Sequence, residues 1–256
     1  MTGRLLIEYD GTEFAGWARQ NGKRSVQAEV ERALGVVLRR GADLPVTCAG
    51  RTDAGVHAWG QVASFEVARE PPPALRTALH SITGDDLAVR GLREAPDGFD
   101  ARRDARSRTY CYRVHLTRTH DPFERGLSLF WPHRMETEGL EACARALLGS
   151  HDFTAFTPTQ TEHVHFEREV IRAGWDREPE RPGREGEVIR FWIEADAFMR
   201  NMVRVLVGTM LEVGSARRTL EDFERLLDGA PREAAADTAR PHGLYLSSVS
   251  YPDGSD

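Results

Sequence analysis

Lysine is nearly absent from this chain of 256 residues. Of its 34 lysines and arginines only Lys23 is a lysine, and every other basic side chain is a guanidinium. A Schiff-base enzyme and a Walker-type phosphate loop each need a lysine in a specific local setting. The sequence RQNGKRS around Lys23 provides neither setting, so both chemistries are excluded. The arginine bias by itself is also explained by genome base composition.

Cysteines and long apolar runs are scarce as well. The three cysteines, Cys48, Cys111 and Cys143, lie far apart, which argues against a disulfide framework or a CxxC metal site and indicates a reducing cytoplasm. The sequence contains no run of about 18 apolar residues, so it predicts no membrane span. Acidic residues in MTGRLLIEYD argue against a signal peptide. The net charge of −6 gives by itself no reason to expect a nucleic-acid partner.

Hydrophobic periodicity predicts a chain of mixed strands and helices. Hairpin-like spacing recurs, which favours an α+β fold over a doubly wound one. We expect two α+β lobes, 1–104 and 105–256, that meet at a cleft. Strands are predicted at 4–9, 44–49, 61–67, 87–94, 109–116, 168–175, 187–196 and 244–251. Helices are predicted after the N-cap Ser25 and at 74–81, 138–148, 198–213 and 220–228.

The stretch AGRTDAGVHA (49–58) places Arg51 and Asp53 on an unusually bare backbone. Gly50 and Gly55 permit backbone geometry and close approach that other residues resist. A lone aspartate in such a stretch is usually a turn residue. Here, however, the neighbouring Arg51 and His57 cost free energy unless something binds. An ion pair between Asp53 and an arginine would keep the carboxylate ionised and oriented.

The segment FDARRDARSRTYCYRVHLTR (99–118) holds six arginines against two aspartates, interleaved with Tyr110 and Tyr112. One interpretation is a solvated edge strand protected by its charges. The other is RNA contact, in which guanidinium groups bind phosphates and an aromatic ring stacks on a base. The segment alone leaves both interpretations open.

In AFMRNMVRVLVG (197–208), Arg200 and Arg204 are spaced to lie on one side of an otherwise apolar helix. A charge inside such a helix needs a partner, and Asp53 is a candidate partner for Arg204. Two pairs of residues contain histidine, Asp53 with His57 and His163 with His165. Neither pair is accompanied by a cluster of cysteines or carboxylates. We therefore predict no metal site.

Several motifs in collinear order then resemble a known family. GRTDAGVHA, EYDGTEFAGWARQ and SVQAEVERAL strongly resemble the TruA-type tRNA pseudouridine synthases, as do FDARRDARSRTYCYRV, HDFTAF, AFMRNMVRVLVGTMLEVG and HGLYLSSVSYP. The resemblance spans about residues 4–252, and GRTDAGVHA is among the family's most specific signatures. It implies the pseudouridine synthase fold, with two α+β lobes that share a continuous, mainly antiparallel sheet flanked by helices and a central active-site cleft.

The resemblance also implies an activity. The family isomerises uridine to pseudouridine in the anticodon stem-loop of tRNA, typically at nucleotides 38, 39 and 40, without metal or organic cofactor. Its members act as homodimers. The uracil must leave C1′, rotate and reattach through C5, so the nucleotide has to flip out of the stem. Whether the aspartate attacks C1′, adds to C6 or takes a proton from C2′ is not readable from sequence, but each route needs an ionised, well-placed carboxylate.

Residue roles transfer from the matched motifs. Asp53 matches the catalytic aspartate, and Arg51 matches the residue that helps to hold the flipped nucleotide. Tyr110 matches the aromatic that packs on the target base, Arg204 matches the arginine that pairs with the aspartate, and Leu244 matches an apolar residue of the base pocket. For RNA binding we expect a basic stripe that faces the cleft, formed by Arg102, Arg103, Arg106, Arg108 and Arg204. Arg200 is expected to be a further RNA-binding residue.

Two residues depart from the family pattern, Asn201 where histidine is frequent and Ala18 where glutamine is frequent. Both put details of RNA contact in question, not the reaction. His57 is expected to support the loop or contact RNA. Two rival functions remain: a catalytically silent RNA-binding protein, and a metal-dependent hydrolase that uses Asp53, His57 and a distant histidine.

Overall fold

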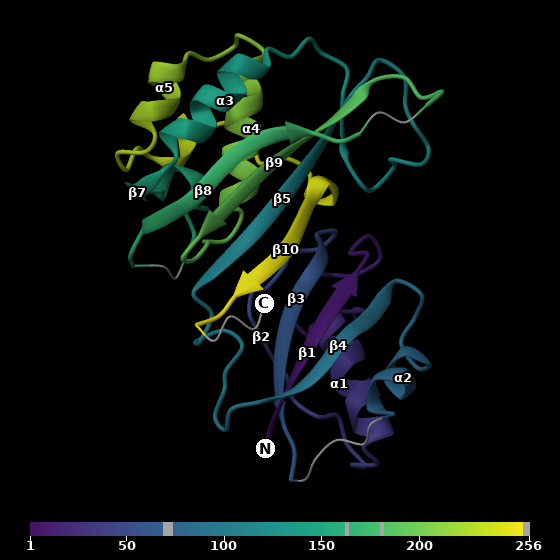
Figure 1. Ribbon diagram of the computed structural model, residues 1–256. Coiled ribbons are helices and arrows are strands. Elements are labelled where there is room, and N and C mark those ends of the chain that lie inside the picture. The colour runs from purple at the N-terminus through teal and green to yellow at the C-terminus, as the bar shows by residue number, and fades with distance from the viewer. Residues whose placement is uncertain (69–73, 162–163, 180–181, 253–256) are drawn as a thin grey trace. The chain divides into compact units, whose positions relative to one another are not determined.

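The computed structural model describes residues 1–68, 74–161, 164–179 and 182–252, and these form two compact units (Figure 1). The first unit comprises Met1–Arg106 and the segment from Tyr245 onward, and the second comprises Ser107–Leu244. The predicted lobes, 1–104 and 105–256, differ from these units in the last strand. As functional lobes they stay a prediction.

The first unit is built on the strand β1, which lies between two antiparallel neighbours, β3 and β4. The short β2, which leads into the loop 49–56, pairs antiparallel with β3, and β10 runs parallel to β3. Two helices, α1 and α2, lie next to each other in this unit (Figure 1). The elements are β1 (Thr2–Tyr9), α1 (Val26–Val37), β2 (Thr47–Cys48), β3 (His57–Glu66), α2 (Leu75–His80), β4 (Leu87–Ala95) and β10 (Leu244–Ser250).

The strand predicted at 4–9 is confirmed as part of β1, in which Leu6 is exposed and its neighbours Leu5 and Ile7 are fully buried. Their register partners on β3 are Ala63 and Gln61, which are buried as well. Helix α1 begins after Ser25, whose hydroxyl accepts a hydrogen bond from the Ala28 amide. The predicted N-cap is therefore confirmed, and it satisfies one of the amides that a helix start leaves unpaired.

The second unit carries an antiparallel sheet in the order β5, β9, β8, β7, with the short β6 parallel to β5. Helices α3, α4 and α5 pack on one another in Figure 1 and bury Leu140, Leu206 and Phe223. The elements are β5 (Ser107–Leu116), β6 (Leu129–Trp131), α3 (Thr137–Ala146), β7 (Gly149–Asp152), η1 (Thr154–Phe156), β8 (Glu167–Arg177), β9 (Glu187–Ala195), α4 (Met202–Gly214), α5 (Leu220–Arg225), η2 (Arg232–Ala234) and η3 (Pro241–Gly243).

The mixed α+β class with mainly antiparallel pairing is confirmed, whereas several element boundaries were predicted wrongly and the short strands β6 and β7 were not predicted. The strand predicted at 61–67 begins already at His57, and the helix predicted at 220–228 ends at Arg225. The strand predicted at 44–49 is reduced to Thr47–Cys48. The helix predicted at 198–213 begins only at Met202, because Asn201 has a left-handed backbone with φ of 62°. A left-handed residue cannot continue a right-handed helix, so Arg200 lies in the preceding turn and not on α4. No described helix is long and apolar enough to cross a membrane.

All three cysteines are free and buried. Burial raises the pKa of each thiol to about 12, and at Cys48 the nearby Arg51 and Arg102 oppose that rise. The thiolate is the reactive form, and at pH 8 a thiol of pKa 12 is ionised in about one molecule in ten thousand. We expect the native protein to resist a thiol reagent at pH 8, while the urea-unfolded chain reacts at all three positions. Spectroscopic titration of released thionitrobenzoate checks this, and rapid native labelling would contradict it.

Candidate functional site

The loop that joins β2 to β3 carries Asp53. It starts with the Ala49 amide donating to the Val62 carbonyl at 2.8 Å, and it turns where the Val56 amide donates to the Asp53 carbonyl at 3.1 Å. Gly55 takes a φ of 76° within this turn. The positive φ explains why glycine follows the aspartate so closely.

The segment 11–17 lies directly against this loop. The Trp17 amide donates to the Thr52 carbonyl at 2.9 Å. A Cβ at Gly16, whose φ is 98°, would lie 2.8 Å from that same carbonyl oxygen. A Cβ at Gly11 would lie 2.0 Å from the Val56 carbonyl oxygen. Any larger residue at either position would push the loop away, so the two glycines set the depth at which Asp53 lies.

The loop contains both buried and accessible residues. Ala49, Thr52 and Val56 are buried, whereas Arg51 is exposed and Asp53 is half-buried. Arg51 and Arg102 both act electrostatically on the Cys48 thiol, so the loop and the segment 96–106 bring two guanidinium groups to the same region of the first unit. The structure therefore brings together three predicted site residues, Arg51, Asp53 and Arg102, in this unit.

His57 is buried at the first position of β3 and has a structural role. Its Nδ1 lies 3.0 Å from the Gly11 amide nitrogen and 3.1 Å from Asp10 Oδ1, and the ring stacks on Tyr245 at 4.6 Å. These contacts tie the end of the loop to the residues after β1, as expected of a residue that supports the loop. Contact of His57 with RNA stays a prediction.

The remaining predicted active-site residues lie in the second unit. Tyr110, on β5, is 8% exposed and packs edge-on against Phe198, with the ring centroids 4.9 Å apart. Leu244 is 6% exposed and follows the turn η3. Their expected contact with a uracil base stays a prediction.

Arg204 lies in the first turn of α4 and is half-buried. Its Nε donates to the Ala239 carbonyl at 2.8 Å, while the Ala239 amide donates back to the Arg204 carbonyl at 3.1 Å. Its Nη1 donates to Asn201 Oδ1 at 3.1 Å. The departure from the family pattern at Asn201 thus has a structural role, because asparagine tolerates the left-handed backbone and orients the arginine. The predicted pair of Arg204 with Asp53 joins residues of different units and stays a prediction.

The predicted RNA-binding arginines differ in their local environment. Asp100 Oδ1 accepts hydrogen bonds from the amides of Arg102 and Arg103, which shapes the segment 96–106. Arg103 forms an ion pair with Asp104 at 2.9 Å, and Arg108 Nη1 donates to the Asp196 carbonyl at 3.0 Å. Arg106 and Arg200 are exposed. Whether these side chains form one stripe stays a prediction, because they belong to two units.

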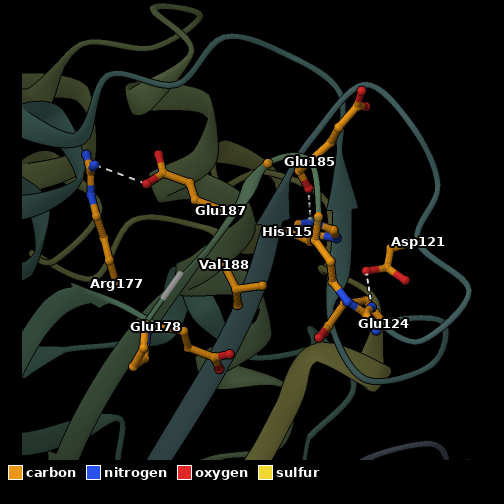
Figure 2. Close-up of a pocket in the computed structure, with 11 residues that line it drawn as sticks. His115, Asp121, Glu124, Arg177, Glu178, Glu185, Glu187 and Val188 are labelled. Carbon is orange, nitrogen blue, oxygen red and sulfur yellow. Dashed lines mark hydrogen bonds and ion pairs between the residues drawn. The ribbon is translucent and has the colours of Figure 1, made fainter. Parts of the chain in front are cut away.

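A polar pocket in the second unit, of about 160 Å³, lies between the ends of β5, β8 and β9 (Figure 2). Its charges largely compensate one another: Arg184 binds Asp121 at 2.5 Å and Arg177 binds Glu187 at 3.0 Å. Figure 2 also shows His115, whose Nε2 lies 3.2 Å from the Glu185 carbonyl. These ion pairs and this hydrogen bond connect the loop 117–128, the residues around Gly186 and strand β5 to one another.

Arg113 lies beside this pocket and is 6% exposed. It binds Glu178 through two nitrogens, at 2.6 and 2.9 Å, and its Nη1 lies 3.0 Å from Glu124 Oε2. Nη1 also donates to the Leu127 carbonyl at 2.8 Å. One buried guanidinium therefore compensates the buried carboxylate of Glu124 and the half-buried carboxylate of Glu178.

Metal ligands are not clustered in the described part of the chain, where no group of three or more histidines, cysteines and carboxylates is placed to hold an ion. His165 is exposed, and His163 lies outside the described residues. Tyr9 and Gln61 were not predicted as site residues from the sequence, although their side chains form hydrogen bonds with the Asp53 loop. A polar residue at one strand position gives no signal of the face on which it lies.

Comparison with known proteins identifies the family. A family model for tRNA pseudouridine synthase matches residues 5–102 and 143–252. The chain is 35% identical to tRNA pseudouridine synthase A of Geobacillus sp. over 97% of both chains. It is 41% identical to the enzyme of that name from Frankia casuarinae, over 97% of this chain and 89% of the relative. The Bacillus subtilis enzyme is 36% identical over 97% and 98% of the two chains. The Asp53 loop and Arg204 both lie within the matched residues, and this chain belongs to the tRNA pseudouridine synthase A family of isomerases.

Proposed function

We propose that the protein isomerises uridine to pseudouridine at nucleotides 38, 39 and 40 of the tRNA anticodon stem-loop, with Asp53 as the essential catalytic group. The observation that carries the proposal is the Asp53 loop itself. Its backbone is fixed by the segment 11–17 and by β3, while Arg51 and Asp53 remain accessible. A rigid loop with one accessible carboxylate is suited to a reaction that depends on the position of a single charged group.

The other side chains supply binding and orientation. Arg51 holds the flipped nucleotide, Tyr110 packs on the target base and Leu244 lines the base pocket. Arg204 pairs with Asp53 and orients its carboxylate, whichever atom of the nucleotide Asp53 engages. Extrusion of a stacked base costs free energy that contacts to the flipped nucleotide offset. The proposed mechanism uses neither metal nor cofactor, and the protein acts in the cytoplasm as a homodimer.

A tritium-release assay tests the proposal. Uridines at nucleotides 38, 39 and 40 of tRNA transcripts are labelled at C5, where the new carbon–carbon bond replaces the hydrogen. We expect release to the solvent with and without a chelator, and pseudouridine at these nucleotides on sequencing. Chelator-sensitive turnover would favour the metal-dependent hydrolase. Binding of tRNA without release would favour a silent RNA-binding protein.

Affinity for tRNA is expected to depend unequally on the arginines of segment 96–106. Arg106 is exposed, whereas the charge of Arg103 is compensated by Asp104. A phosphate contact contributes to the salt dependence of binding, and its loss lowers the slope of log K against log salt by about 1. We expect Arg106→Ala to weaken tRNA binding and reduce that slope, and Arg103→Ala to do so less. Equal effects of the two variants in filter binding over a salt series would contradict this.

A further inference from the structure

Three polar side chains form a buried chain of hydrogen bonds beneath the Asp53 loop. Tyr9 is 3% exposed, Thr52 is 7% exposed and Gln61 is fully buried. Tyr9 Oη lies 2.8 Å from Thr52 Oγ1, and Gln61 Nε2 lies 3.5 Å from the same Tyr9 oxygen. The three residues come from β1, the loop and β3, so the chain links the loop to two adjacent strands.

Gln61 binds the loop backbone with both ends of its amide. Its Nε2 donates to the Gly50 carbonyl at 2.6 Å, and the Gly50 amide donates to its Oε1 at 3.4 Å. Gln61 Nε2 also lies within hydrogen-bond distance of Tyr9 Oη, and Tyr9 Oη shares a hydrogen bond with Thr52 Oγ1 in which either hydroxyl can be the donor. The side chains of Gln61, Tyr9 and Thr52 are therefore joined in one continuous buried network.

The network acts on the two residues that flank Arg51. Gly50 is bound through its backbone and Thr52 through its side chain, and the Thr52 carbonyl also receives the Trp17 amide. Positions 50 and 52 are thus fixed from below, while Arg51 is exposed and Asp53 half-buried. A backbone held at positions 50 and 52 limits the directions that the side chains of Arg51 and Asp53 can take.

A role in stability alone is a poor explanation for this choice of residues. Buried polar groups must be desolvated, and apolar side chains of similar shape often stabilise such a site at least as well. Matched polar networks do, however, fix one geometry, because any shift leaves a buried donor or acceptor unpaired. Reaction rates are sensitive to displacements of about 1 Å, which can cost about a hundredfold.

We propose that Tyr9, Thr52 and Gln61 are positioning residues that set the place of Asp53, and with it Arg51, relative to the target nucleotide. The inference rests on the proposed catalytic role of Asp53. Tyr9, Thr52 and Gln61 act through the loop and do not contact the substrate. Their effect is therefore expected on the turnover step, more than on tRNA binding.

The test compares Thr52→Val with Thr52→Ser. Valine keeps the shape and loses the hydroxyl, which leaves Tyr9 Oη without this partner, whereas serine keeps the hydroxyl. We expect Thr52→Val and Tyr9→Phe to lower kcat for tritium release about 10- to 100-fold, with KM for tRNA changed by less than about threefold. Thr52→Ser should retain most of the turnover. The double variant Tyr9→Phe with Thr52→Val should be no slower than the slower single variant, since both remove one interaction.

Thr209→Val is the matched control. Thr209 is fully buried, and its hydroxyl donates to the Val205 carbonyl and accepts from the Ala236 amide, so the same substitution removes a comparable hydroxyl far from the loop in sequence. We expect Thr209→Val to lower the melting temperature without lowering kcat per folded molecule. The concentration of folded molecules is measured from the stoichiometry of tRNA binding. Hydrogen exchange at residues 50–56 should accelerate in Thr52→Val and Tyr9→Phe only.

The outcomes separate the two proposals. Wild-type turnover in Asp53→Asn would overturn the catalytic role of Asp53. The proposal that Tyr9, Thr52 and Gln61 position Asp53 for catalysis would then fall with it. An inactive Asp53→Asn beside fully active Thr52→Val and Tyr9→Phe would overturn the positioning role alone. Equal loss of kcat in Thr52→Val and Thr209→Val would also overturn it, because the loss would then follow from general destabilisation.

Discussion

Asp53→Asn is expected to abolish tritium release from C5-labelled tRNA while leaving tRNA binding close to that of the wild type. The substitution keeps the size of the side chain and removes its charge, and each chemical route for the reaction needs an ionised carboxylate. Loss of a group that acts directly on the reacting atoms costs several orders of magnitude in rate, so the residual release should fall to the background. Single-turnover release with enzyme in excess over tRNA measures the effect without interference from product dissociation.

Asp97→Asn is the control for this substitution. The Asp97 side chain is 90% exposed and forms an ion pair with the N-terminal amine of Met1 at 3.7 Å, outside the loop. We expect this variant to release tritium at the wild-type rate. Substantial release by Asp53→Asn, once deamidation of the new asparagine back to aspartate is excluded by mass spectrometry, would refute the proposed mechanism.

Arg113→Ala is expected to cause the largest loss of stability. The buried guanidinium compensates Glu124 and Glu178, and its removal leaves two carboxylates in a site with little solvent. Breaking a buried ion pair by removal of one partner typically costs about 3 to 5 kcal/mol. Urea unfolding followed by the fluorescence of Trp175 and Trp192, which lie on the adjacent strands β8 and β9, measures the change in the free energy of unfolding of the second unit.

Two further variants define what Arg113 contributes. Arg145→Ala removes an exposed guanidinium that lies 3.9 Å from Glu141, and an exposed pair of this kind should contribute little. The triple variant Arg113→Met, Glu124→Leu, Glu178→Met replaces all three charges by apolar groups. We expect it to recover most of the stability that Arg113→Ala loses, since buried ion pairs are often replaceable by well-packed apolar residues. Wild-type stability of Arg113→Ala would contradict the assigned role.

Sequence reasoning located most of the elements because their apolar residues repeat with a clear period. It failed at α4, where AFMRNMV has the helical pattern from residue 198 but the left-handed backbone of Asn201 delays the start to Met202. Propensity does not exclude asparagine from a helix strongly enough to reveal such a position. As a consequence, Arg200 and Arg204 are not on the same helical face.

The Asp53 loop was predictable, whereas the residues beneath it were not. GRTDAGVHA is a local signal, but Tyr9 and Gln61 approach the loop from two strands. The register between β1 and β3 shifts between Ile7 and Tyr9, where the pairs Ile7–Gln61 and Tyr9–Ala58 differ by one residue. A β-bulge of this kind changes which residues share a face, and simple alternation along HAWGQVASFE therefore says little about where Gln61 lies.

The parallel pairing of β10 with β3 affects the order in which the chain can fold during synthesis. Tyr245 stacks between His57 and Trp59, so the strand that follows the Asp53 loop acquires this neighbour only after almost the entire chain has been made. The second unit, Ser107–Leu244, is a contiguous segment. On the ribosome, most of its strands and helices can therefore pair and pack before the first unit receives its last strand, although most of the first unit is synthesised earlier.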